Sequence, residues 1–122
     1  MINDMTTLEI CDNLASELRR GSLVLAVLGQ CTEAQYGYSL KQRLEVAGLV
    51  VNEGTLYPLL RRLEGQGLLT SAWQLNDAER PRRYYQLSAS GAEVRAQLAV
   101  EWGQLVAILA RLQPENKQGS GL

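Results

Sequence analysis

The stretch LLTSAWQLNDAERPRRYYQL, residues 68–87, gives the clearest indication of the fold. Its first part, Leu68–Leu75, and its last part, Arg82–Leu87, contain the aromatic, hydroxyl and aliphatic residues that suit a half-buried strand. The residues between them, Asn76–Pro81, are polar and end in proline, which is typical of a loop. Two strand-like runs on either side of a short polar loop predict a β-hairpin. We therefore expect a small hairpin in a chain whose other elements are helical.

A helix is expected directly before the hairpin. Four leucines between residues 56 and 63 recur at spacings that place them on one helical face. Two alternatives exist for the start of this helix. If Asn52 is the N-cap, Pro58 falls inside the helix and removes the hydrogen bond to the Gly54 carbonyl. If Thr55 is the cap, Pro58 lies in the first turn, where its missing N–H costs nothing.

Two helices are expected at the start of the chain. Thr6 or Thr7 caps the first, which runs to about residue 18. The polar run Arg19–Ser22 then interrupts the apolar pattern. The apolar run Leu23–Leu28 fits either a buried strand or a buried helix by itself, and we predict a separate helix with Ser22 as its cap.

Two more helices complete the predicted elements. One opens at Tyr36–Tyr38, after the polar break Thr32–Gln35, and Gly48 is its expected stop. The final helix is capped by Ser88 and ends before Pro114. Its apolar residues follow a coiled-coil-like spacing of 4, 4, 3, 4 and 3. They are Val94, Leu98, Trp102, Leu105, Leu109 and Leu112.

Composition excludes several classes of enzyme and metal site. The 122 residues include no histidine and two cysteines, Cys11 and Cys31. Histidine-dependent nucleophile pairs, histidine acid–base steps and the usual zinc sites are therefore excluded. The sequence also shows no clustered carboxylate pair and no glycine-rich phosphate loop, so we expect no enzyme activity, no metal and no cofactor. Free thiols and the lack of a membrane-length apolar run favour a cytoplasmic protein, in which Cys31 is buried and inert.

Charge is distributed unevenly, although the net charge is −1. Residues 1–18 contain four acidic and no basic side chains, whereas residues 19–83 contain nine basic and six acidic ones. Ten of the twelve basic residues are arginines, whose guanidinium groups suit bidentate contacts with phosphate and guanine. Charge alone favours an ordinary solvated surface. The basic middle segment indicates a function only when it is considered together with the order of the predicted elements.

That order, helices followed at once by a hairpin, matches a winged helix-turn-helix. The helix before the hairpin presents amide, hydroxyl and cationic groups, which bind base edges and phosphates. The hairpin carries three arginines within four positions, as expected for a wing at the DNA backbone or a minor groove. The predicted DNA-binding residues are Tyr38, Lys41, Asn52, Thr55, Tyr57, Pro58, Arg61, Arg62, Arg80, Arg82 and Arg83. The alternative is a winged-helix adaptor that binds proteins and has no affinity for double-stranded DNA.

Four motifs resemble the PadR family of bacterial transcriptional regulators. They are LRRGSL at 18–23, YGYSL at 36–40, EGTLYPLLRRLE at 53–64 with Gly67-Leu68, and RRYY at 82–85 with Leu87 and Gly91. The resemblance extends from about Leu18 to Leu112, and the single C-terminal helix is similar to that of the smaller PadR subfamily. This subfamily is similar to multidrug-response repressors. The resemblance implies a repressor that binds an operator and is relieved by a small aromatic effector.

The resemblance also implies a homodimer in which the C-terminal helix packs against the partner's N-terminal helices. Residues 94–112 support this independently, because they carry more apolar surface than one small core covers. The expected interface residues are Leu98, Trp102, Leu105 and Leu109. The expected organisation is an acidic N-terminal helix (1–18), a winged-helix DNA-binding domain (19–88), a C-terminal dimerisation helix (89–113) and a disordered tail (114–122).

Trp102 allows two interpretations. On an apolar seam, a tryptophan most often packs in the core of an interface. Regulators similar to this chain hold flat aromatic effectors between two such side chains at the dimer interface. The resemblance therefore makes Trp102 a candidate effector-binding residue as well as a dimerisation residue.

Overall fold

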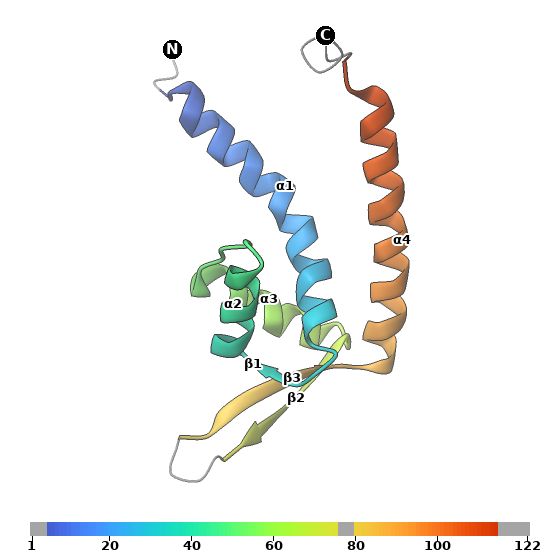
Figure 1. Ribbon diagram of the computed structural model, residues 1–122. Coiled ribbons are helices and arrows are strands. Elements are labelled where there is room, and N and C mark those ends of the chain that lie inside the picture. Colours follow the sequence, from blue (N-terminus) through green and yellow to red (C-terminus); the bar gives the residue numbers. More distant parts are fainter. Residues whose placement is uncertain (1–4, 76–79, 115–122) are drawn as a thin grey trace.

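The computed structural model describes residues 5–75 and 80–114 of the chain. The prediction of a disordered tail falls mainly on residues 115–122, which lie outside this range. The helices are α1 (Thr7–Gln30), α2 (Gly37–Val46), α3 (Glu53–Gly65) and α4 (Ala89–Leu112), and the strands are β1 (Gln35–Tyr36), β2 (Leu69–Gln74) and β3 (Arg82–Leu87) (Figure 1). This is the winged helix-turn-helix order that the sequence predicts, with a long helix at each end.

Helix α1 is continuous, so the prediction of two helices separated at Arg19–Ser22 is wrong. Thr6 caps its start: the Thr6 hydroxyl accepts from the Glu9 N–H at 3.1 Å, and the Glu9 carboxylate accepts from the Thr6 N–H at 2.7 Å. Ser22 is not a cap, because its hydroxyl donates to the Arg19 carbonyl within the helix at 2.9 Å. Gly21 inside the helix costs only about 1 kcal/mol of helix stability. Burial of the leucine and valine side chains that follow it contributes more than this.

The sheet has three antiparallel strands in the order β1-β3-β2. The predicted hairpin supplies two of them, β2 and β3, and the third, β1, is not predicted from the sequence. Strand β1 consists of Gln35, the last residue of the predicted polar break, and Tyr36, which the sequence places at the start of the next helix. It pairs with β3 through Gln35 opposite Tyr85 and Tyr36 opposite Tyr84. Two residues are too few to show an alternating pattern. Gln35 is buried, and its side-chain oxygen accepts from the Ser39 hydroxyl at 2.8 Å, so this polar residue is satisfied within the fold.

The turns and caps around α3 agree with the sequence. Gly48, the predicted stop of α2, has a φ of 102°, a left-handed conformation that glycine adopts without steric cost. Asn52 is the N-cap of α3, since its side-chain oxygen accepts from the Thr55 N–H at 2.8 Å. Of the two alternatives for this start, the first therefore holds, and Pro58 lies inside α3.

The core lies where the C-terminal half of α1, helices α2 and α3, and the sheet meet. Its residues are Leu23, Val27, Leu28, Cys31, Leu40, Leu44, Val51, Leu56, Leu59, Leu60, Leu63, Leu69 and Tyr85. Burial raises the pKa of the Cys31 thiol to about 12, which agrees with the prediction of an inert cysteine. The leucine face of α3 is thus used entirely for packing, and the opposite face is left exposed.

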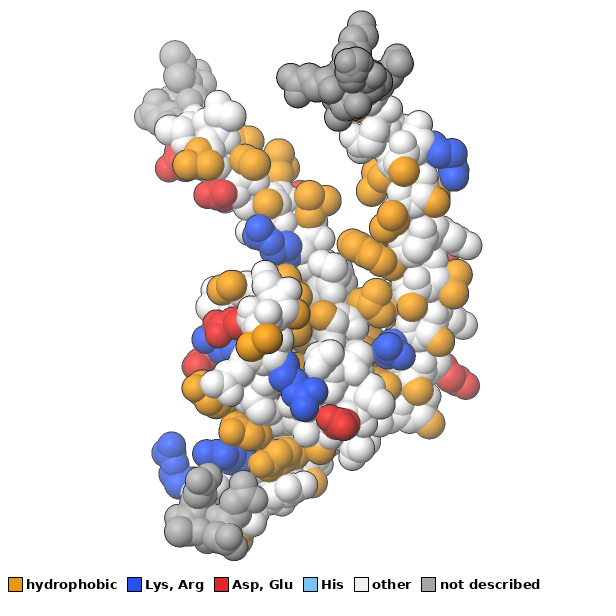
Figure 2. Space-filling model, viewed as in Figure 1, with side chains coloured by type: hydrophobic (Ala, Val, Ile, Leu, Met, Phe, Trp, Pro, Cys, Tyr) orange, Lys and Arg blue, Asp and Glu red, His pale blue; other side chains and the backbone are white. Residues whose placement is uncertain are grey.

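The outer halves of α1 and α4 extend beyond this core and diverge from each other (Figure 1). Both carry large exposed apolar side chains, which appear as orange atoms along the two helices (Figure 2). On α1 they include Leu8, Ile10, Leu14 and Leu18, and on α4 Val100, Trp102, Leu105, Val106, Ile108, Leu109 and Leu112. Within the described residues, neither these helices nor the shorter ones combine the length and hydropathy needed to cross a bilayer.

Candidate nucleic-acid interface

The exposed face of α3 gathers most of the predicted base-reading residues. Four of them come from the helix itself and one from its cap, and all are exposed because the leucines opposite them fill the core. These residues are Asn52, Thr55, Pro58, Arg61 and Arg62. The face thus combines amide, hydroxyl and guanidinium groups on one rigid element, as the sequence predicts.

Asn52 and Thr55 have different tasks at the start of α3. The side-chain oxygen of Asn52 is occupied by the capping hydrogen bond to the Thr55 N–H. Thr55 uses only its backbone in this contact, and its side chain is exposed. The Thr55 hydroxyl is therefore placed in the first turn without a capping role.

Tyr57 is half-buried and differs from its neighbours on α3. Its ring covers Gly37 at the start of α2 so closely that a Cβ atom at Gly37 would overlap it. Helices α2 and α3 approach each other at this point because Gly37 has no side chain. Tyr57 therefore has a packing role that the sequence does not reveal, and its role in DNA contact stays a prediction.

Arg80 and Arg82 lie on the wing and face the solvent to different extents. Arg80 is exposed, whereas Arg82 is half-buried with its guanidinium 4.5 Å from the centre of the Tyr36 ring. The Tyr36 ring in turn meets Tyr84 edge-on, with 5.3 Å between the ring centres. Strand β1 thus places an aromatic platform under a wing arginine. Tyr36 lies in a motif noted from the sequence, but its pairing with β3 could not be seen there.

Arg83, the third wing arginine, is bound within the protein. Its guanidinium lies 3.0 Å from the Glu64 carboxylate on α3, and its Nε donates to the Ser71 hydroxyl at 2.9 Å. Ser71 in turn donates to Glu64 at 2.5 Å. The pKa of Glu64 is lowered, first by the hydrogen bond from Ser71 and then by Arg83. The contacts among these three side chains hold the wing against α3. Glu64 and Ser71 therefore belong to the site, although the sequence does not predict them as site residues.

Helix α2 carries the two remaining predicted residues. Tyr38 is exposed, and its hydroxyl accepts from the Gln42 amide at 3.0 Å. Lys41 forms an ion pair with Glu45 one turn later, at 3.4 Å. Both lie on the helix that packs against α3, so they flank the exposed face rather than form part of it.

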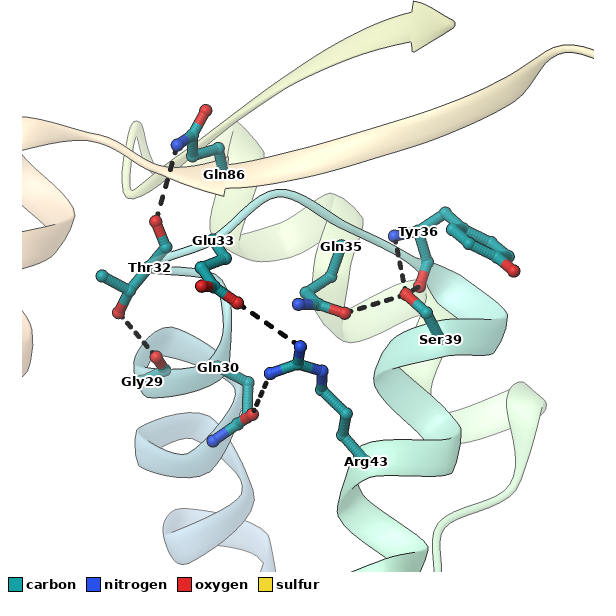
Figure 3. A network of polar contacts seen from close by, with 9 residues as sticks. All are labelled: Gly29, Gln30, Thr32, Glu33, Gln35, Tyr36, Ser39, Arg43 and Gln86. Atoms are coloured by element: carbon teal, nitrogen blue, oxygen red, sulfur yellow. Dashed lines mark hydrogen bonds and ion pairs between the residues drawn. The ribbon is translucent and has the colours of Figure 1, made fainter. Parts of the chain in front are cut away.

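A polar network fixes α2 against the end of α1 and against β1 (Figure 3). Arg43 of α2 contacts the Glu33 carboxylate at 3.4 Å and the Gln30 side chain at 3.3 Å. At the other end, the Ser39 hydroxyl accepts from the Tyr36 N–H at 3.2 Å and donates to Gln35. These contacts orient α2 and, through Gly37, the helix α3 that packs on it.

The predicted dimerisation residues lie along α4, but they are not equivalent. Leu98 is half-buried and packs against the core of its own chain. Trp102, Leu105 and Leu109 are 45%, 49% and 51% exposed, respectively. Three of the four residues thus present apolar surface that the single chain leaves in contact with water.

Comparisons with known proteins agree with this geometry. A model described as the transcriptional regulator PadR-like family matches residues 24–97. The chain is 38% identical over 76 residues to the transcriptional regulator Rv3488 of Mycobacterium tuberculosis, and this alignment covers 62% of the chain and 70% of the relative. A crystal structure of a PadR family transcriptional regulator from Eggerthella lenta superposes with a TM-score of 0.81 at 41% identity, covering 88% of this chain and 95% of that one.

A more distant structure is informative because of its ligand. Bacillus subtilis PadR in complex with operator DNA superposes with a TM-score of 0.59 at 19% identity, covering 65% of this chain and 47% of that one. At this identity, the likeness shows a shared fold.

Proposed function

The chain belongs to the PadR-like family of transcriptional regulators, and from this premise we propose that it binds an operator sequence-specifically as a repressor relieved by a small aromatic effector. The observation that carries the DNA-binding proposal is the exposed face of α3, with two arginines, next to a wing with Arg80 and Arg82. Cationic groups on two neighbouring elements suit the phosphates that flank a groove, and the polar groups of α3 suit base edges. The operator complex of Bacillus subtilis PadR, which has the same fold, supports this proposal.

We assign different roles to the residues of this interface. Thr55 and the two arginines of α3, Arg61 and Arg62, read bases or bind adjacent phosphates. Arg80 and Arg82 bind the DNA backbone, whereas Arg83 orients the wing through Glu64. Asn52 holds the start of α3, and Tyr57 contacts DNA only with the edge that its packing on Gly37 leaves accessible. Pro58 lies on the α3 face between Thr55 and the arginines, and Tyr38 and Lys41 line the margin of the interface.

The active form in this proposal is a homodimer. Leu18 on α1 and Trp102, Leu105 and Leu109 on α4 are apolar and 74%, 45%, 49% and 51% exposed in the single chain. Exposed apolar side chains of this number and size favour association, and a twofold axis lets the same residues serve both subunits. Residues 19–88 then bind a half-site in each subunit, and residues 89–113 join the subunits.

An effector is proposed to bind at Trp102. In the dimer, two indole rings related by the twofold axis offer flat apolar faces to a planar ligand. A ligand changes operator affinity only if it binds better to one arrangement of the two wings than to the other. For the ligand to relieve repression, the arrangement that it favours must hold the two wings in positions that do not fit the two half-sites.

Selection of binding sequences from a random duplex pool tests the DNA-binding proposal. We expect enrichment of a sequence with two related half-sites about one helical turn apart, or a multiple of this distance. A matched pair of variants identifies the surface: Arg62→Gln on α3 should weaken binding to the selected duplex, whereas Arg111→Gln at the end of α4 should not.

No enrichment with the dimeric protein would contradict the proposal. It would favour the alternative, a winged-helix adaptor that uses the same face for a protein partner. We further propose that the protein works in the cytoplasm, where it would meet the chromosome, as a regulator without enzyme activity.

A further inference from the structure

A hollow of about 280 Å³ lies between the middle of α1 and the loop that leads into α3. Its base is apolar and includes Leu23 and Val51, both of which belong to the buried core. Its rim is polar and includes Arg19, Arg20 and Thr55. The hollow is thus built from residues far apart in the sequence, and the core fixes its shape.

The two arginines on the rim, Arg19 and Arg20, are the basic residues of α1. Both side chains are exposed, and neither guanidinium forms a hydrogen bond or an ion pair with another described residue. Glu17 on α1 and Glu53 at the start of α3 are the acidic residues closest to the hollow in sequence. Among the described residues, neither carboxylate forms an ion pair with these guanidinium groups.

The hollow is continuous with the exposed face of α3. Thr55, which we assign to base reading, lines both, and the α3 cap Asn52 also lines the hollow. The continuity of helix α1 matters here. Because α1 does not break at Arg19, the two guanidinium groups are carried on a rigid element that lines the same hollow as the start of α3.

We propose that Arg19 and Arg20 bind a backbone phosphate of the operator DNA at this hollow, as a third contact besides α3 and the wing. This inference rests on the proposed function. Two adjacent guanidinium groups without protein partners bind phosphate oxygens readily, since the contact is charge-assisted and can be bidentate. The phosphates beside the base pairs that face Thr55 are the anions nearest to this rim when α3 lies in a groove. The contact adds affinity without sequence preference.

The test compares two double variants of the full chain that lose the same charge. Arg19→Gln/Arg20→Gln removes the proposed contact, and glutamine keeps a high helix propensity in α1. Arg95→Gln/Arg111→Gln, on α4 but outside the apolar residues assigned to the dimer, is the control, and sedimentation must show that it stays dimeric. The probe is the duplex enriched from the random pool, and the dissociation constant is measured over a series of salt concentrations.

We expect the slope of log Kd against log salt to become shallower by about 1 to 2 in the α1 variant and to stay unchanged in the control. The preferred sequence should stay the same in both. In the wild type, a single uncharged methylphosphonate at the contacted phosphate should weaken binding. The α1 variant should no longer respond to this change.

Two results would overturn the inference while leaving the proposed function intact. If the α1 variant binds with the wild-type slope, while Arg62→Gln weakens binding, the hollow is not a DNA contact. If the α1 variant sediments as a monomer where the wild type is a dimer, the arginines bind the acidic surface of a second copy. Failure of the wild type to bind any duplex would instead overturn the proposed function itself.

Discussion

The guanidinium of Arg83 on the wing lies 3.0 Å from the carboxylate of Glu64 on α3. A basic side chain that the sequence assigns to DNA is therefore used to hold the wing against the recognition helix. Its neighbours differ: the guanidinium of Arg82 lies 4.5 Å from the centre of the Tyr36 ring, and Arg80 is exposed. The three wing arginines should thus respond differently to substitution.

Arg83→Ala should lower the free energy of unfolding by about 1 kcal/mol, and Arg80→Ala should leave it unchanged. The value is modest because the Arg83 side chain is 40% exposed, and water screens a partly exposed pair. A chain of this size should lose several degrees in Tm, measured by circular dichroism at equal protein concentrations. Equal melting temperatures for wild type and Arg83→Ala would show that Glu64 and Arg83 do not stabilise the wing.

The same contact should make stability depend on acid pH. The Ser71 hydroxyl, and after it Arg83, holds the pKa of Glu64 below its ordinary value of 4.5. A carboxyl whose pKa is lower in the folded state stabilises the fold above its unfolded pKa, and this contribution disappears as the pH falls through the folded pKa. Denaturant unfolding between pH 6 and pH 3, compared between wild type and Glu64→Gln, measures it. The free energy of unfolding of Glu64→Gln should fall less than that of the wild type as the pH is lowered. If the two free energies fall in parallel, the ionised Glu64 carboxylate does not stabilise the fold.

The contact between Tyr57 and Gly37 gives a test that separates packing from DNA binding. Gly37→Ala should destabilise the protein by about 1 to 3 kcal/mol, because the added methyl group overlaps the Tyr57 ring. Tyr57→Leu in the same chain should recover part of this loss, since the smaller side chain leaves room. Tyr57→Phe keeps the ring and removes the hydroxyl. A fall in operator affinity at constant Tm in Tyr57→Phe would assign the hydroxyl to DNA contact.

Leu105→Glu should prevent dimer formation. Leu105 is half-exposed on the apolar face of α4, and a carboxylate there must be buried without a partner when two subunits meet. Sedimentation should show monomers, and operator binding should be lost because one subunit reaches only one half-site. Glu101→Gln, one turn earlier on α4, is the control. A Leu105→Glu protein that stays dimeric would place the interface elsewhere.

Effector binding at Trp102 is tested by fluorescence. In Trp73→Phe, Trp102 is the only tryptophan, and planar cationic dyes and hydroxycinnamic acids should quench it saturably. The same ligands should lower operator affinity, with a coupling of about 1 to 3 kcal/mol. Quenching that leaves operator affinity unchanged would contradict an effector role, and absence of quenching by both classes would leave Trp102 as a packing residue.

Local patterns were sufficient to predict most of the elements. The leucine spacing of α3, the cap at Ser88 and the stop at Gly48 are set by residues within one or two helical turns, and the structure confirms all three. The continuity of α1 was missed because the local signals at Gly21 and Ser22 are opposed by packing of the following residues. Strand β1 was missed because its partner lies about fifty residues later.

The part of the site on α3 could be predicted, because the spacing of the leucines shows which side chains of that helix are exposed. Thr55, Arg61 and Arg62 are exposed because the leucine face of α3 is buried. Arg83 could not be assigned in this way, since Glu64 lies nineteen residues earlier and only the folded sheet brings them together. Tyr57 was judged by its position on the helix, whereas its environment is set by a glycine on α2.

If the exposed face of α3 reads DNA sequence, a single ratio of dissociation constants should show it. This ratio is the Kd for a scrambled duplex divided by the Kd for the selected duplex, measured at one salt concentration for the wild type and for Thr55→Ala. We expect a wild-type ratio on the order of 10³ or more, and a clearly smaller ratio in Thr55→Ala at unchanged Tm. Equal affinity of the wild type for the two duplexes would contradict sequence reading by α3.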